Sequence, residues 1–104
     1  KISYHILGTI DQSLISIGRI IPYNKEKKVS IGRIAVEENY RKNGYALKLM
    51  NEIIYFINSN FPNFKITLSA QTYLKDFYIS LGFKAHGESY FEDGIPHIYM
   101  IKNN

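Results

Sequence analysis

The sequence contains no cysteine, and its apolar runs are all far too short to cross a bilayer. The absence of cysteine excludes disulfide bonds and thiol chemistry. The opening residues 1–3 do not show a signal-peptide pattern, and no linker or low-complexity segment interrupts the chain. We therefore expect a cytoplasmic protein that does not associate with membranes.

Two common kinds of site are missing as well. The sequence has no glycine-rich Walker loop, and its three histidines are scattered without the spacing of metal ligands. We therefore expect neither a P-loop nucleotide site nor a metal site.

The composition is that of a single folded domain spanning residues 1–104. With 45% hydrophobic and 21% charged residues, a chain of this length can build one core and bury roughly 65% of its unfolded surface. Thirteen Lys and Arg against nine Asp and Glu give a net charge of +4, which favours polyanionic partners. Much of this charge gathers at two predicted turns. A solvated surface or a phosphorylated ligand therefore explains it better than nucleic acid does.

The first third of the chain predicts an antiparallel meander. Residues 4–10 and 14–21 are rich in strand formers and are separated by a turn signal at residues 11–13. A second turn signal, at residues 22–28, precedes a strand at residues 29–36. Connections this short favour three consecutive antiparallel strands.

The third strand changes its apolar phase. Val29 and Ile31 are odd-numbered, whereas Ile34 and Val36 are even-numbered. A β-bulge near residues 32–33 would turn both pairs toward one side. Burial of the strand on both faces would explain the same pattern.

Residues 30–57 predict a strand, a basic turn and an amphipathic helix. The helix positions with apolar residues share one face, and they are Ala46, Leu47, Met50, Ile53, Ile54 and Ile57. The helix begins near Gly44 and ends at residues 58–60, before Pro62. Because a helix start presents free NH groups and a positive dipole end, the basic turn before it favours phosphate binding.

The remaining elements complete a mixed sheet. Residues 64–70 predict a strand that pairs in parallel with the strand before the helix, through a right-handed crossover. Thr72 caps a predicted short helix that ends at residue 81. A long terminal hairpin follows, with strands at residues 83–90 and 98–102. The fold class is α+β, with a strongly twisted mixed sheet.

Two motifs resemble those of the GCN5-related N-acetyltransferases (GNAT). Arg41-x-x-Gly44-x-Ala46 after an apolar strand resembles the family's acetyl-CoA signature, and residues 77–83 resemble its second signature, which ends in Leu-Gly-Phe. Ala70-Gln71 and residues 92–100 resemble the ElaA-type branch. The resemblance covers nearly the whole chain. It implies that the strand and helices with which the family begins are missing here.

The resemblance also implies a cofactor and a reaction. Acetyl-CoA would donate an acetyl group to a primary amine, by direct attack of the amine. The implied cofactor-binding residues are Ile34, Ala35, Val36, Arg41, Lys42, Asn43, Gly44, Tyr45, Ala46, Gln71 and Tyr78. The family often has Asn at the position of Gln71, so the reach of that side chain differs here.

The predicted catalytic residues are Tyr78 and His97. By resemblance, the Tyr78 hydroxyl protonates the departing sulfur. His97 is a candidate base, with His86, Glu88, Glu92 and a water relay as alternatives.

The predicted substrate residues are Arg19, Arg33 and Glu88. The two arginines are expected at equivalent places in adjacent strands, where their repulsion calls for an anion between them. An internal carboxylate, Glu88 or Glu92, is favoured over a carboxylate of the substrate.

Two other functions compete with this interpretation. A non-catalytic acyl-CoA-binding or regulatory module could have the same fold, and a basic nucleic-acid-binding domain fits the charge less well. The identity of the amine stays open, and so does a homodimer.

Overall fold

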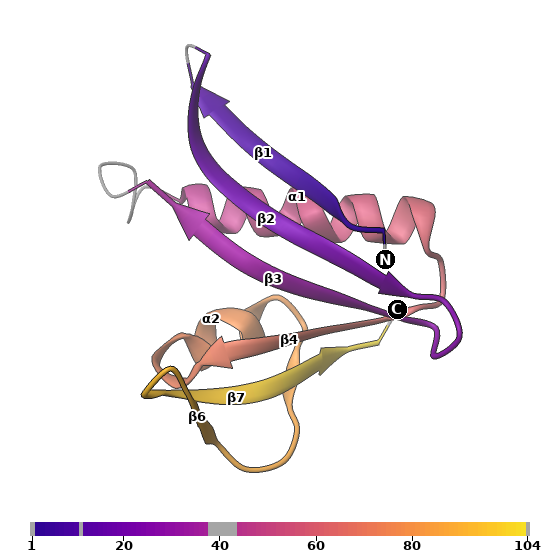
Figure 1. Ribbon diagram of the computed structural model, residues 1–104, viewed down its shortest axis with the longest axis vertical. Coiled ribbons are helices and arrows are strands. Elements are labelled where there is room, and N and C mark those ends of the chain that lie inside the picture. Colours follow the sequence, from indigo (N-terminus) through magenta and orange to yellow (C-terminus); the bar gives the residue numbers. More distant parts are fainter. Residues whose placement is uncertain (1, 11, 38–43, 104) are drawn as a thin grey trace.

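The computed structural model describes residues 2–10, 12–37 and 44–103, and only the backbone of Arg33. Its seven strands form one sheet in the order β1-β2-β3-β4-β7-β5, with β6 also paired to β7. Figure 1 shows this twisted sheet with helix α1 packed against it. The elements are β1 (Tyr4–Ile10), β2 (Ser13–Tyr23), β3 (Lys28–Val36), α1 (Tyr45–Asn60), β4 (Lys65–Gln71), the short turn η2 (Thr72–Leu74), α2 (Lys75–Ser80), β5 (Lys84–Ala85), β6 (Tyr90–Glu92) and β7 (Ile95–Lys102).

The predicted meander and parallel crossover are confirmed. β1, β2 and β3 pair antiparallel in sequence, and β3 pairs with β4 in parallel through α1. The β2–β3 register shifts so that Ile17 faces Ala35 while Arg19 faces Gly32, which is the predicted bulge. The predicted turn at residues 22–28 is too long, because β2 continues through Pro22 to Tyr23. The pairing of β2 with β1 ends at Ile20, so the β1 side of Pro22 has no neighbouring strand. The missing NH group of Pro22 therefore costs no hydrogen bond to β1.

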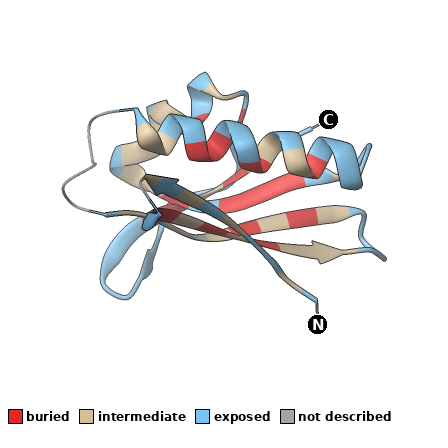
Figure 2. Cartoon of the chain, turned by 90° about the horizontal axis from the view of Figure 1, so that it is seen from above, coloured by how far each residue is buried: buried red, intermediate tan, exposed pale blue. Residues whose placement is uncertain are grey.

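One core lies between the helices and one face of the sheet. Leu49, Met50, Ile53 and Ile57 of α1 are buried in it, and α2 adds Tyr78 to the same cluster. Figure 2 shows the buried residues of α1 facing the strands. The predicted helix face is wrong at Leu47, which is 45% exposed, while Leu49 takes its place in the core.

The end of the chain differs most from the prediction. The expected strand at 83–90 is split into β5 and β6, because Gly87 adopts a φ of +82° between them. The hairpin turn is shorter than predicted and consists of Asp93 and Gly94, both at positive φ, so that β7 already begins at Ile95. Thr72 is the first residue of η2 and not its N-cap, a position held by Gln71 without a side-chain hydrogen bond.

Candidate active site

A cleft opens where β3 and β4 separate. The two strands pair only over Lys28–Ile31 and Lys65–Leu68, and beyond this they diverge (Figure 1). The cleft has a volume of about 720 Å³, which is within the usual range for ligand pockets. Its lining comes from β3, the start of α1, the end of β4, η2 and α2, and consists of Ile34, Ala35, Val36, Gly44, Ala46, Leu47, Gln71, Tyr73, Leu74, Phe77 and Tyr78.

Most of the predicted cofactor residues meet in this cleft. They are Ile34, Ala35, Val36, Gly44, Ala46, Gln71 and Tyr78. Tyr45 lies instead along a second, smaller hollow. Arg41, Lys42 and Asn43 fall outside the described residues, so the expected phosphate contacts of their side chains stay a prediction.

Gly44 forms the start of α1 at the edge of the cleft. Its φ of +80° is in the left-handed region that favours glycine, and a Cβ atom built there would meet nothing within 4 Å. Among the described residues no side chain caps the helix, and its first turn has no acidic residue. The free NH groups and the positive end of the helix dipole therefore make this end of the cleft suit an anionic ligand.

Tyr78 places a protonated phenol against the cleft. Its side chain is only 6% exposed and packs edge-to-face on Phe77 and Phe83, with ring centroids 5.2 and 6.0 Å away. Burial, and secondarily the neighbouring Tyr73, raises the pKa of Tyr78 above its ordinary value of 10.0. The hydroxyl therefore stays protonated at neutral pH and can donate a proton or a hydrogen bond.

His97 lies one strand away from the cleft. In the β4–β7 ladder it is the partner of Gln71, which lines the cleft. Its Nδ1 lies 2.8 Å from the Ile95 carbonyl oxygen, and since that oxygen can only accept, Nδ1 must carry the proton. In the neutral ring Nε2 is then an acceptor, and it lies 4.0 Å from Glu92 Oε2. Nε2 is thus the ring atom that can accept a hydrogen bond or a proton.

A polar cluster surrounds the Glu92 carboxylate. Ser69 Oγ donates to Glu92 Oε1 at 3.4 Å and also hydrogen-bonds with Tyr90 Oη. The Tyr90 ring stacks on His97 at a centroid distance of 6.3 Å. The cluster thus joins β4, β6 and β7 at the end of the sheet where the cleft opens.

The predicted pairing of the two arginines is not what the register gives. Arg19 has Gly32 as its direct partner, because the bulge shifts Arg33 by one position, and the side chain of Arg33 is outside the description. The internal carboxylate expected between the two arginines stays a prediction. Within residues 2–10, 12–37 and 44–103 no acid pairs with Arg19, and Glu92 lies by His97. Glu88 lies exposed in the irregular segment between β5 and β6.

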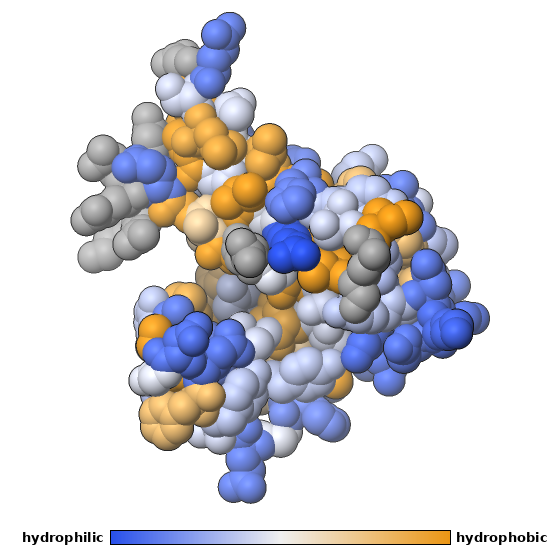
Figure 3. Space-filling view, in the orientation of Figure 1, coloured by the Kyte–Doolittle hydropathy of each residue, from blue (hydrophilic) through white to orange (hydrophobic). Residues whose placement is uncertain are grey.

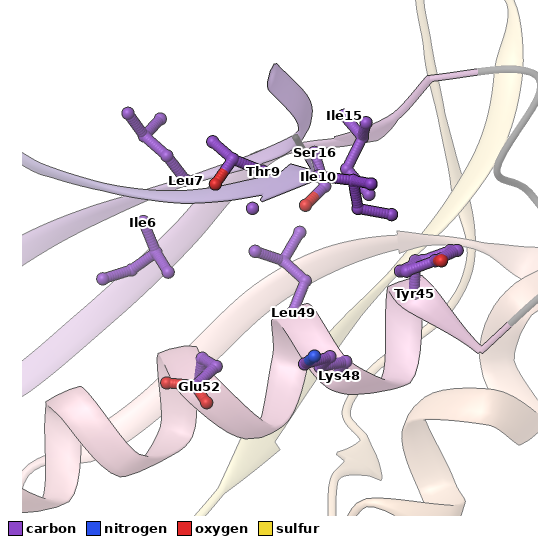
Figure 4. Close-up of a pocket in the computed structure, with 11 residues that line it drawn as sticks. Ile6, Leu7, Thr9, Ile10, Ile15, Ser16, Tyr45, Lys48, Leu49 and Glu52 are labelled. Atoms are coloured by element: carbon purple, nitrogen blue, oxygen red, sulfur yellow. The ribbon is translucent and has the colours of Figure 1, made fainter. Parts of the chain in front are cut away.

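The second hollow lies between the β1–β2 hairpin and α1. It measures about 250 Å³ and is mainly apolar, with Leu49 pointing into it and Lys48 and Glu52 at its rim (Figure 4). A Cβ atom at Gly8 would lie 2.1 Å from Ser16 Oγ, so the hairpin floor is closely packed. In the described part of the chain no three His, Asp or Glu side chains gather to hold a metal, and no helix there is long and apolar enough to cross a membrane.

Several lining residues escaped the sequence analysis. Leu47 and Tyr73 line the cleft although both are largely exposed, at 45% and 77%. Ser69 could have been found, because strand alternation places it on the same face as Gln71. Tyr90 could not, because its contact with Ser69 depends on the register of β6 against β7.

The fold and the cleft are those of the GNAT class of proteins. The family model described as "Acetyltransferase (GNAT) domain" matches residues 2–104, and the chain belongs to this family. Protein ElaA of Escherichia coli K12 is 36% identical over 99 residues, covering 94% of this chain and 65% of ElaA. The crystal structure of E. coli ElaA matches with a TM-score of 0.89, 35% identity and coverage of 96% of this chain and 68% of that chain. The ElaA-type resemblance is thereby confirmed.

Two further relatives agree with this assignment. A UPF0039 protein of Schizosaccharomyces pombe is 38% identical over 101 residues, covering 96% of this chain and 67% of that protein. The structure of an acyl-CoA N-acyltransferase from Pseudomonas aeruginosa matches with a TM-score of 0.89 and 31% identity, over 96% of this chain and 68% of that one. The chain thus spans about two thirds of the length of these relatives.

Proposed function

We propose that this chain carries the cofactor cleft of an N-acyltransferase that uses acetyl-CoA to acetylate a primary amine by direct attack. One observation carries the proposal. Residues of β3, α1, β4 and α2 that the family resemblance implies for the cofactor converge on a single cleft, and one of them is the buried Tyr78. Membership of the GNAT family supports an acyl-CoA donor in general. The acetyl group and the amine are the finer part of the proposal.

The cleft offers complementary groups along its length. The backbone of Ile34, Ala35 and Val36 lies along the diverging part of β3, where the pantetheine arm can bind like an added strand. The Gln71 amide can hydrogen-bond the same arm. The start of α1 at Gly44, together with Arg41, Lys42 and Asn43, would hold the pyrophosphate.

Acetyl-CoA, when bound, supplies an activated thioester carbonyl. The amine nitrogen bonds to the acyl carbon, the carbon–sulfur bond breaks and sulfur leaves with the electron pair. Tyr78 donates its proton to that sulfur, and His97 Nε2 takes the proton lost by the amine. Where the amine does not reach Nε2 directly, a bound water would relay the proton. Arg19, Arg33 and Glu88 remain the candidates for holding the acceptor.

The cofactor assignment is tested by thermal denaturation with acetyl-CoA. A ligand that binds only the folded state adds about 2.7 kcal/mol at about 100 times its Kd, which is roughly ten degrees for a domain of this size. In Gly44→Asp a carboxylate points toward the pyrophosphate, so we expect the shift to disappear while unfolding stays cooperative. Gly87→Asp is the matched control, because Gly87 also has a positive φ and open space around it.

Three outcomes would contradict the proposal. An undiminished shift in Gly44→Asp would remove the cofactor from this cleft. A larger shift with a duplex oligonucleotide than with acetyl-CoA, at moderate salt, would favour the nucleic-acid alternative. If acetyl-CoA raises the melting temperature but no amine causes release of CoA, the chain would be a non-catalytic acyl-CoA-binding module.

A further inference from the structure

The face of the sheet opposite the helices carries an unusual row of residues. Arg19 of β2 pairs with Gly32 of β3, so the two share a face. Ile31 pairs with Leu68 on the core side, and alternation therefore places Gly32 and Ser69 together on the opposite face. Figure 3 shows this face in space-filling form, with a hollow between the part formed by β1–β3 and the part formed by β4, β6 and β7.

Arg19 stands at one end of the row as a cation with no carboxylate partner among the described residues. Its Nε is fully shielded from solvent and has no hydrogen-bond partner among the described residues. A shielded donor without an acceptor is costly, and such groups in native proteins usually have a functional explanation. The Arg19 residue as a whole is only partly buried, so its planar guanidinium can still receive an anion.

Gly32 leaves the space beside Arg19 open. A Cβ atom built on Gly32 would meet nothing within 4 Å. The β3–β4 pairing ends at Ile31 and Leu68, so Gly32 and Ser69 lie where the two strands begin to diverge. A small molecule that contacts both Arg19 and the end of β4 would therefore lie across this opening.

The Glu92 carboxylate stands at the other end of the row. Ser69 donates a hydrogen bond to this carboxylate. The Glu92 side chain is still 54% exposed, so the carboxylate can also accept a hydrogen bond from a ligand. His97 Nε2 lies beside it, 4.0 Å from Oε2. An ammonium group bound to Glu92 would thus lie next to the group that takes its proton.

We infer that the acceptor is an amino carboxylate, whose amine binds at Glu92 and whose carboxylate binds Arg19. The inference rests on the proposed acyl transfer and names its substrate class. Opposite charges at the two ends of one open floor favour a molecule with an ammonium at one end and a carboxylate at the other. A simple alkylamine would leave Arg19 unpaired.

The test compares ω-amino carboxylates, from glycine to aminohexanoate, with alkylamines of the same carbon number. Release of CoA by the intact protein is measured for each pair. A charge-assisted bond to Arg19 should favour the amino carboxylate about 10- to 100-fold in kcat/KM. Arg19→Met should abolish this preference by raising the KM of the amino carboxylate to that of the matching alkylamine. Lys65→Met is the matched control, because Lys65 is another exposed cation on the same face, at the far end of β4.

A second measurement does not depend on turnover. The Nε–H resonance of Arg19, assigned by its loss in Arg19→Met, should shift when aminohexanoate is added and should not shift with hexylamine. Equal kcat/KM within every pair, or a preference that survives Arg19→Met, overturns the inference. If no amine is acetylated, the Arg19 Nε–H resonance alone tests the inference. A resonance that does not shift with aminohexanoate overturns it. Failure of the acetyl-CoA thermal shift would count against the proposed function alone.

Discussion

The apolar surroundings of Tyr78 determine both the position of its hydroxyl and its pKa. Its ring is held edge-on by Phe77 and Phe83, so the hydroxyl is presented to the cleft from a fixed position. The same apolar surroundings disfavour the phenolate and raise the pKa of Tyr78. A proton donor to a leaving thiolate needs both properties, because it must be aimed at the sulfur and must remain protonated.

Tyr78→Phe tests this role with the least disturbance to packing. We expect turnover to fall roughly 30- to 1000-fold, because a thiol with a pKa of about 8.5 is a tolerable leaving group even without assistance. The affinity for acetyl-CoA, measured by thermal shift, should stay within about three-fold of the parent value. Binding reports the ground-state complex, whereas turnover reports the transition state, where the hydroxyl acts. Tyr73→Phe is the matched control, because Tyr73 lines the same cleft but is 77% exposed. Near-parental turnover in Tyr78→Phe would make Tyr78 a packing residue.

At the scale of elements, β2 lies unusually close to α1. A Cβ atom at Gly18 would lie 2.5 Å from Ile53 Cδ1 and 3.1 Å from Ile34 Cδ1. The missing side chain therefore lets the helix pack down on the strand and buries Ile53 completely. Because Ile34 belongs to the diverging part of β3, this contact also helps to set the wall of the cleft.

Gly18→Ala should consequently lower the free energy of unfolding by about 1 to 3 kcal/mol, the usual cost of overpacking. Ile53→Val removes the Cδ1 atom that the new methyl would meet, so the double variant should lose less than the sum of the two single changes. Gly32→Ala is the control in the neighbouring strand, where a methyl has open space. Urea denaturation gives all four values. Strictly additive losses would show that Ile53 is not what opposes the methyl.

The sequence predicted those elements whose determinants are local. β1 has the predicted bounds, α1 starts beside the predicted glycine, and the phase change in β3 correctly signalled a bulge. What failed depends on pairing between distant strands. The split of the last hairpin follows from β7 pairing with both β5 and β6, and no local pattern specifies this.

The candidate site divides in the same way. Much of the lining of the cleft was predictable, because the two family motifs contain residues that form it. Gly44 and Ala46 belong to the first motif, and Tyr78 belongs to the second. The arrangement of the residues proposed to hold the amine acceptor could not be predicted, because their positions depend on which residues pair across neighbouring strands. A shift of one position at the bulge replaced the expected arginine pair by Arg19 and Gly32.

At the scale of the whole molecule, the helices and the cleft divide the sheet between stability and function. One face holds the continuous core with α1 and α2, and the other carries Arg19 and the cluster around Glu92. Tyr78 belongs to both, since it is part of the core cluster and also lines the cleft. Its protonation should therefore affect the stability of the whole domain as well as turnover.

This coupling gives a pH dependence whose sign is fixed. The folded protein raises the pKa of Tyr78 above 10.0, so above pH 10 the unfolded chain loses this proton before the folded chain does. The contribution of Tyr78 is then fully present below pH about 10 and is lost as pH rises toward the folded pKa, by at most about 1.4 kcal/mol per pH unit.

Tyr78→Phe isolates the effect, because lysines and the other tyrosines titrate in both proteins and cancel in the difference. Urea denaturation of the parent and Tyr78→Phe should give a constant difference in unfolding free energy from about pH 7 to 9. Above pH about 10 the parent should lose stability faster than Tyr78→Phe. A difference that stays constant to pH about 11 would mean that the phenol ionises as easily in the folded protein as in the unfolded chain. That result would contradict the raised pKa of Tyr78, and the link between its burial and its protonation would be lost.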